Sequence, residues 1–366
     1  MRERPLRFGF LAVLLLLAGC AERPGLDVLA DVAAPVPPGA KVVTVYVATT
    51  RASYPGGTVF SSRRAHKLSF AEYTISVPPG HVPGQIEWPD GNPDPARTFA
   101  TLRQRPLSKA EFQAKIAPGA KGRRASAFVH GFNVTFQEAL FQTAQMSADF
   151  DTSGTPILFT WPSAGKVLDY VADKDAVTIS RDGLAETLAA MTGGRKSGEA
   201  LLLGHSMGGW LTLETLRQLK ITGRQDVLDR LEVILANPDV DIDVFRSQVA
   251  TIGRMNPPLR VLVAKDDVAL RVSAFVAGDK GRVGAIDVHD PRVEEASHRY
   301  GVQVVDISSV KSSDGLNHSR FAQLAAHMGG ADNRKAVQTT GAFVLNSVGT
   351  ILSAPFAVAG QVVAGR

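Results

Sequence analysis

The sequence predicts an α/β fold built on a mostly parallel, doubly wound sheet. From residue 116 to residue 330, short apolar runs alternate with longer segments of helical periodicity. Short apolar runs are typical of strands buried on both faces, and strands that alternate with helices form parallel sheets. The expected strands are 125–129, 155–160, 201–203, 231–236, 259–264 and 302–306, and the expected helices are 137–150, 175–191, 210–220 and 242–254.

The region before this core, residues 41–115, is richer in β-branched and turn residues. We expect antiparallel strands at the edge of the sheet and a flap near the site, so that residues 41–330 form one domain. The formal net charge of +5 over 366 residues is too small to indicate nucleic-acid binding. The sequence has no P-loop, dinucleotide glycine fingerprint or zinc-ligand spacing, and we expect neither a metal nor a cofactor.

A G-x-S-x-G pattern, residues 204–208, lies between an expected strand and an expected helix. This context is typical of a nucleophile elbow centred on Ser206. In such a turn, Gly204 and Gly208 are needed because larger side chains would collide with neighbouring backbone. The N–H of Met207, at the start of the helix, would point to the position of a developing oxyanion.

A serine nucleophile needs a histidine base and an acid that orients it. Asp267 and His318 follow the last two expected strands, and the carboxyl ends of parallel strands lie at one edge of a sheet. Of the eight histidines, His318 is the one on a loop directly after a terminal strand. His205 lies inside the elbow, and we expect it to point away from Ser206. The others are His66, His81, His130, His289, His298 and His327.

The acid has alternatives. Asp267 is preferred to Asp266 because it lies further along the loop and precedes a helix-forming Ala-Leu pair. Asp239 and Asp241 follow the preceding strand, where some triads of this order carry the acid, but the same segment also makes an ordinary turn and helix cap.

The loop His130-Gly131-Phe132-Asn133 follows strand 125–129 and is expected to complete the oxyanion hole. Gly131 would let the backbone approach the substrate, and the N–H of Phe132 would be the second donor. Asn133 would brace the loop or contact substrate. A plain β-turn is the alternative interpretation.

Several segments together resemble a bacterial α/β-hydrolase family catalogued as domain of unknown function 900. They are 45–51, 128–133, 159–165, the elbow, 237–241 with Phe245, 267–270 with Ser273, and 317–319. The resemblance implies an α/β-hydrolase fold and, by position, the triad Ser206, Asp267 and His318. It also places Trp161, with His130, among residues that contact substrate or support the loop. Asn237 departs from the small apolar residue expected there.

Members of this family are described as esterase-like or lipase-like, and the resemblance implies no particular substrate. We therefore expect a serine hydrolase that cleaves carboxylic esters through an acyl-enzyme on Ser206. The same triad would also suit an amidase, a peptidase or an acyltransferase. A non-catalytic envelope-binding protein on a hydrolase scaffold is the alternative from another class, because fold does not settle function.

The N-terminus predicts export. Residues 1–19 combine three arginines with an apolar run and resemble the signal peptide of a bacterial lipoprotein precursor. The run is too short to cross a bilayer, and Leu17-Ala18-Gly19-Cys20 resembles a lipobox, with Cys20 the lipidated residue. Residues 20–40 would be a tether. With Ala21 after the cysteine, the resemblance favours the outer membrane, with the protein facing the periplasm.

The C-terminal segment, residues 331–366, carries no charge between positions 336 and 365. A small-residue helix pair packed on the domain, or lying on the membrane surface, is the preferred interpretation. A membrane span is the alternative, which Pro355, Asn346 and Gln361 weaken.

Overall fold

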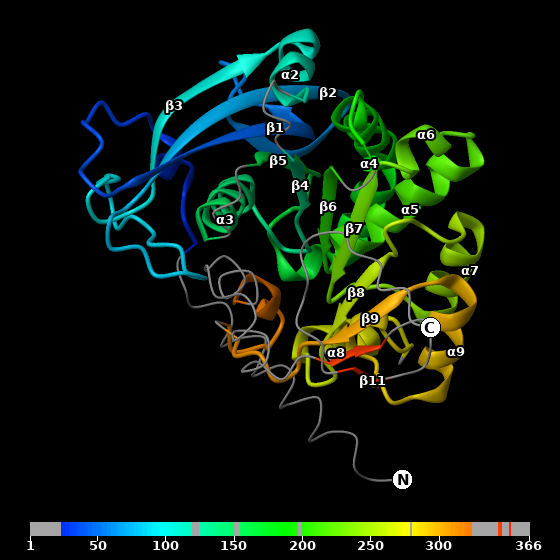
Figure 1. Ribbon diagram of the computed structural model, residues 1–366. Helices are drawn as coiled ribbons and strands as arrows, with labels where there is room; N and C mark the ends of the chain where they lie inside the picture. Colours follow the sequence, from blue (N-terminus) through cyan, green and yellow to red (C-terminus); the bar gives the residue numbers. More distant parts are fainter. Residues whose placement is uncertain are drawn as a thin grey trace.

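In the described part of the chain, the centre of the protein is one eleven-stranded sheet with helices on both faces (Figure 1). The computed structural model describes residues 23–118, 124–149, 154–196, 199–278, 280–312, 314–323, 343–345 and 351–352. In these residues the strand order is β11-β10-β9-β8-β7-β6-β4-β5-β1-β2-β3. The expected α/β-hydrolase architecture is confirmed. No helix in the described residues is long and apolar enough to span a membrane.

Each strand and helix expected in the core is present, and the described residues contain further helices and strands that were not expected. The strands are β1 (Lys41–Ser53), β2 (Phe60–Val77), β3 (Ala100–Leu107), β4 (Ala125–Val129), β5 (Thr155–Thr160), β6 (Ala200–His205), β7 (Leu231–Ala236), β8 (Arg260–Val263), β9 (Gln303–Asp306), β10 (Phe343–Leu345) and β11 (Ile351–Leu352). The α-helices are α2 (Lys109–Ile116), α3 (Phe136–Asp149), α4 (Tyr170–Thr192), α5 (Met207–Ile221), α6 (Gln225–Leu228), α7 (Ile242–Ile252), α8 (Val268–Val276) and α9 (Pro291–Tyr300). The described residues also form the short 3₁₀ helices η1 (Leu26–Leu29), η2 (Val167–Asp169) and η3 (Val283–Ala285).

Successive side chains of the central strands enter opposite cores, as the pleat of a strand requires. Ala127 and Val129 of β4 join the core under α4, α5 and α7, whereas Phe128 joins the core under α3. Figure 1 shows α3 on one face and α4 to α7 on the other. Burial on both faces explains why these strands read as continuous apolar runs.

The N-terminal strands form one edge, as expected, but not all are antiparallel to their neighbours. β2 pairs antiparallel with both β1 and β3. β1 itself pairs parallel with β5, from Tyr46–Ile157 to Thr49–Thr160. The parallel part of the sheet therefore extends to β1, and the carboxyl end of β1 reaches the edge where the site lies.

The expectation of a tether over residues 20–40 is wrong for residues 24–32, which pack on the domain. Val28 and Leu29 of η1 are buried in the core under α3. The N–H of Val32 donates to the carbonyl of Thr101 at 2.8 Å, and Gln104 donates to the carbonyl of Leu29. The segment is bound along β3 because it supplies apolar side chains and satisfies backbone groups there. Residues 20–22 lie outside the described residues, as does the predicted signal peptide.

The described residues of the C-terminal segment are strands. β10 pairs antiparallel with β9, and β11 pairs antiparallel with β10. These five residues do not form the helix pair we expected, since they extend the sheet instead. The rest of segment 331–366 lies outside the described residues.

Candidate active site

Ser206 lies at the tight turn between β6 and α5, with φ 52° and ψ −120°. A positive φ is costly for a residue with a side chain, and strain of this kind persists where the surroundings fix it. The Ser206 N–H donates to the carbonyl of Ala236 at 2.9 Å. Its carbonyl accepts from the N–H groups of Gly209 at 2.9 Å and Asp239 at 3.1 Å. The predicted elbow is therefore present and is held by β7, by the loop after β7 and by the first turn of α5.

The glycines of the elbow have the role that the sequence predicts. A Cβ on Gly208 would lie 2.4 Å from the carbonyl oxygens of Val129 and His130, and one on Gly204 would lie 2.5 Å from the Thr212 hydroxyl. Both distances are far below van der Waals contact. The close approach of β4 to the elbow thus requires glycine.

The structure brings the predicted acid and base together. The Nδ1 of His318 lies 2.7 Å from Oδ2 of Asp267, whose side chain is fully buried. The other carboxylate oxygen, Oδ1, accepts the N–H of Leu270 at 2.9 Å and caps α8. Asp267 is therefore fixed at both oxygens, which sets the orientation of the imidazole.

The three alternative acids have other partners. Asp266 binds the Arg320 guanidinium, at 2.7 Å for one of the two contacts. Asp239 forms an ion pair with Arg282 at 3.0 Å. Asp241 caps α7 through the N–H of Asp243. The choice of Asp267 as the partner of His318 agrees with this geometry.

The environment of His318 favours its protonated form. Burial alone would lower the pKa of His318, but the hydrogen bond to Asp267 and the charges of Asp267, Asp314 and Asp239 together raise it above its usual value. Asp314 also accepts the backbone N–H of His318 at 3.0 Å and that of Ser319 at 2.8 Å. It therefore positions the loop that carries the base.

His205 is a site residue whose role the sequence did not reveal. Its ring centroid lies 4.6 Å from that of His318, and its Nε2 lies 3.3 Å from the His318 carbonyl. Burial and the nearby charge of His318 keep the pKa of His205 well below its usual value. A neutral His205 ring thus supports the base from the strand that carries the nucleophile.

Asn237, the departure noted in the sequence, also belongs to the site. It is fully buried with φ 45°, and its Nδ2 donates to Asp267 Oδ2 at 2.9 Å. Asparagine tolerates this left-handed conformation better than most residues. Asn237 and His318 therefore bind the same carboxylate oxygen, and the amide holds the acid in place.

The predicted oxyanion loop lies directly against the nucleophile. A Cβ on Gly131 would lie 3.0 Å from the Cβ of Ser206. The ring of Phe132 packs edge-on against Tyr170 at 5.2 Å, and Asn133 has φ 59°. The loop thus has the close backbone approach that the sequence predicts.

Two of the predicted loop residues are braces. His130 is fully buried, with its Nε2 2.9 Å from the Thr160 hydroxyl and its ring stacked on Trp161 at 5.0 Å. The Trp161 indole donates to the His130 carbonyl at 2.9 Å. Burial and the charge of Arg51 lower the pKa of His130 to about 3. Of the two roles proposed for His130 and Trp161, the buried positions favour loop support.

Arg51, at the end of β1, is a buried cation beneath this loop. Its guanidinium donates to the Thr160 hydroxyl at 2.8 Å and to the carbonyls of Val134 at 2.9 Å and Ser163 at 3.1 Å. Burial lowers the pKa of Arg51 to about 9, while the charge of Asp173 opposes that shift. Its segment carries the family resemblance, but its role was not predicted.

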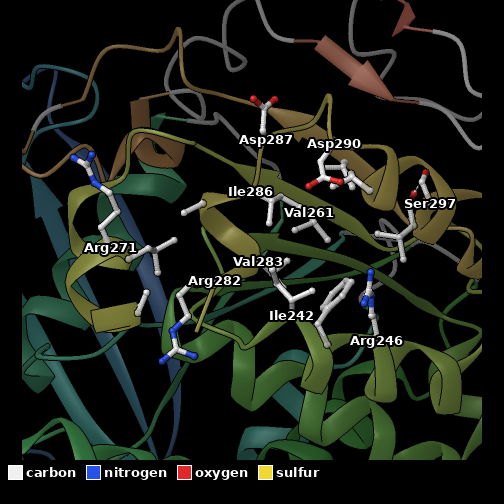
Figure 2. Close-up of a pocket in the computed structure, with 18 residues that line it drawn as sticks. Ile242, Arg246, Val261, Arg271, Arg282, Val283, Ile286, Asp287, Asp290 and Ser297 are labelled. Carbon is white, nitrogen blue, oxygen red and sulfur yellow. Dashed lines mark hydrogen bonds between the residues drawn. The ribbon is translucent and has the colours of Figure 1, made fainter. Parts of the chain in front are cut away.

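A second buried polar cluster lies on the other side of Ser206. Asp239 accepts from Tyr170 at 2.8 Å and from Ser273 at 2.6 Å, in addition to its ion pair with Arg282. Arg282 also lines an apolar pocket of about 350 Å³ between α7, α9 and the last parallel strands (Figure 2). Figure 2 shows its guanidinium turned away from Val283. Arg282 in the pocket wall pairs with Asp239, and the N–H of Asp239 donates to the Ser206 carbonyl. A chain of polar contacts therefore joins the pocket wall to the backbone of the nucleophile.

Across the described ranges, no group of three or more His, Cys, Asp or Glu side chains could hold a metal ion.

Comparison with known proteins agrees with this geometry. A family model described as "Alpha/beta hydrolase of unknown function" (DUF900) matches residues 108–329, more than half of the chain. The chain belongs to this family. It is also similar to the uncharacterized protein alr1448 of Nostoc sp., with 28% identity over 115 residues. That alignment covers 25% of this chain and 30% of the relative, so the similarity is confined to less than a third of the other protein.

Proposed function

We propose that this member of the α/β-hydrolase family is a serine esterase that acts on carboxylic esters through an acyl-enzyme. The observation that carries the proposal is the elbow serine at φ 52° combined with the buried His318–Asp267 pair, in the chain order of such enzymes. An elbow of this strain and an acid fixed at both oxygens are features of a working nucleophile.

In the proposed reaction, His318 Nε2 removes the Ser206 proton while Oγ attacks the ester carbonyl. The N–H groups of Met207 and Phe132 would stabilise the tetrahedral oxyanion. His318 then donates that proton to the leaving alcohol, which gives the acyl-enzyme and an alcohol. His318 then deprotonates a water molecule, which attacks the acyl-enzyme. As the bond between Ser206 Oγ and the acyl carbon breaks, His318 returns the proton to Oγ and the carboxylic acid is released.

The test is turnover of p-nitrophenyl esters of increasing chain length, together with labelling by a fluorophosphonate. Wild type should react with the label at Ser206 and hydrolyse at least the short esters. Ser206→Ala should remove labelling. Ser206→Ala and His318→Ala should each remove most turnover and leave a rate at most about 10³- to 10⁴-fold above that of the uncatalysed reaction in water. A wild-type protein that neither labels nor hydrolyses would favour the binding-protein alternative. Cleavage of amides in preference to esters would favour the amidase alternative.

The proposed location is the bacterial envelope, with Cys20 lipidated and the domain facing the periplasm from the outer membrane. Support comes from the lipobox-like residues 17–20 after an apolar run. Cys20→Ser should abolish incorporation of labelled palmitate and leave an uncleaved precursor or an aberrantly processed soluble form. Palmitate labelling of the Cys20→Ser protein would contradict this assignment.

A further inference from the structure

The described chain begins beside the active site. Arg23 donates to the carbonyl of Asn133, in the oxyanion loop, at 2.6 Å, and also to the carbonyl of Gly165. Its Nε lies 3.4 Å from Glu138, and the next residue, Pro24, accepts a hydrogen bond from Gln137 at 2.6 Å. The first described residues are therefore fixed to the loops at the carboxyl edge of the sheet.

The position of Arg23 limits where Cys20 can lie. The two residues are three positions apart, and three residues reach at most about 11 Å when fully extended. An acyl group on Cys20 would therefore leave the protein close to the oxyanion loop. A lipid anchor attached there would hold this face, and not the opposite edge of the sheet, against its membrane.

Large apolar side chains are exposed at the same place. Arg23 binds the Gly165 carbonyl, and η2 begins two residues later. In η2, Val167 is 44% exposed and Leu168 is 95% exposed. Val171, one residue into α4, is 70% exposed. Single exposed apolar residues are ordinary, but three within five positions beside a lipid attachment point indicate contact with an apolar phase.

Further apolar side chains are exposed on α8 and on the loop that carries His318. Tyr170, beside Val171, is hydrogen-bonded to Ser273 of α8 at 3.0 Å. Val276 at the end of α8 is 58% exposed, and Leu316, two residues before His318, is 39% exposed. The carbonyl of Leu316 accepts the N–H at the start of α8. The loop that carries the base therefore also has an exposed apolar side chain.

We propose that the active-site face is the membrane-contact surface, so that lipidated Cys20 and the apolar rim Val167, Leu168 and Val171 enter the same bilayer. Ser206 then receives acyl esters of lipids directly from that bilayer. The proposal rests on the proposed esterase function and on lipidation of Cys20. The lipid on Cys20 would hold the protein at the membrane, and an apolar contact beside it would then bind the same bilayer at high effective concentration.

The orientation is tested without reference to hydrolysis. Cys20 is the single cysteine of the chain, so a cysteine introduced into the lipidated protein can carry an environment-sensitive dye at one known position. Leu168→Cys is compared with Ile221→Cys, which is 56% exposed and ends α5, about 21 Å along the helix that starts beside Ser206. Both proteins are reconstituted into vesicles of phosphatidylethanolamine and phosphatidylglycerol that contain a spin-labelled phospholipid.

The spin label should quench the dye at position 168 and leave the dye at position 221 bright. Equal quenching at both positions, or quenching at 221 alone, overturns the proposal. Reaction of the dye with Cys20 itself would show a free thiol and would also overturn it.

The substrate source is tested with Leu168→Asp/Val171→Asp and the matched control Ile221→Asp. On an ester lipid embedded in vesicles, the double variant should be slower by about tenfold or more, since each large apolar side chain withdrawn from water contributes about this factor to partitioning. On soluble p-nitrophenyl acetate the rate of the double variant should stay within about twofold of wild type, and Ile221→Asp should not affect either rate.

The proposal is contradicted if the double variant and wild type cleave the vesicle substrate at equal rates, or if the double variant loses the same factor on both substrates. If wild type cleaves neither ester, the esterase function fails while the quenching result still decides the orientation.

Discussion

The two sides of Ser206 are built differently. The acid–base side is made by loops that follow three adjacent strands. His318 and Asn237 both bind one carboxylate oxygen, Oδ2 of Asp267. On the oxyanion side, the loop after β4 is held by Arg51, a buried cation from β1 that donates to the Val134 carbonyl of this loop and to the Ser163 carbonyl of the loop after β5. The acid–base side is a short chain of charged hydrogen bonds, whereas the oxyanion side is a buried network within the core.

This difference separates chemistry from stability. A substitution that preserves shape on the acid–base side should change proton transfer and leave most packing intact. A substitution beneath the oxyanion loop should leave buried carbonyls without donors and so lower the free energy of unfolding as well as activity.

Asp267→Asn should have the largest effect on rate. Asparagine keeps the α8 cap but offers an N–H where His318 needs an acceptor, so the imidazole is held in the wrong tautomer. We expect kcat to fall by about 10³ to 10⁴, with the unfolding free energy changed by less than about 2 kcal/mol. Steady-state kinetics and urea unfolding measure the two quantities.

Asp241→Asn is the matched control, because Asp241 likewise caps a helix, α7. Its rate should remain near that of wild type. If Asp241→Asn or Asp239→Asn were inactive while Asp267→Asn kept its activity, Asp267 would not be the acid.

Arg51→Met should affect stability most. Methionine fills much of the same volume but removes the donors to the carbonyls of Val134 and Ser163. We expect a loss of about 3 to 5 kcal/mol in unfolding free energy and a lower kcat, because the oxyanion loop loses its support. Urea unfolding followed by circular dichroism measures the first, and ester turnover below the unfolding transition measures the second.

Arg63→Met removes an exposed arginine from the adjacent strand and should change neither quantity by much. If Arg51→Met were as stable as Arg63→Met, the buried network would not set the stability of this side, and the contrast between the two sides would fail.

The sequence could predict most strands and the triad because both depend on local or ordered features. Strand 231–236 was predicted at its observed bounds, since apolar runs and turns mark strands directly. Asp267 and His318 were predicted because strands entered in order place their ends along one edge. Chain order alone therefore located the acid–base side.

The supporting residues could not be predicted in this way. Arg51 meets carbonyls 83 and 112 positions further along the chain, and no local pattern reveals such contacts. Asn237 could be recognised only as a departure from the small apolar residue expected there, because the acid that its amide binds, Asp267, is 30 positions away. Residues 24–32 were included in the predicted tether because composition does not distinguish a free chain from one bound along a strand.

Asn237→Gly should produce an intermediate effect on the acid–base side. Glycine tolerates the φ of 45° but removes one of the two donors to Asp267 Oδ2. Loss of a buried hydrogen bond to a charged group suggests a fall in kcat of roughly 10- to 100-fold. Fluorophosphonate labelling should slow in parallel. An unchanged kcat would show that the cap of α8 alone holds the carboxylate.

The pH dependence should reflect the acid–base side alone and is the smallest effect. His318 must be neutral to accept the Ser206 proton, and its raised pKa means that kcat/KM should fall as the pH drops through a value above about 6.5. Asp314→Asn removes a negative charge that raises this pKa, so the acidic limb should move to lower pH. The oxyanion side should not contribute between about pH 5 and 8, because burial keeps the pKa of His130 at about 3 and that of Arg51 at about 9. Profiles of kcat/KM against pH for wild type and Asp314→Asn on a soluble ester measure this shift. An acidic limb at the same pH in both proteins would show that the Asp314 charge does not raise the pKa of His318.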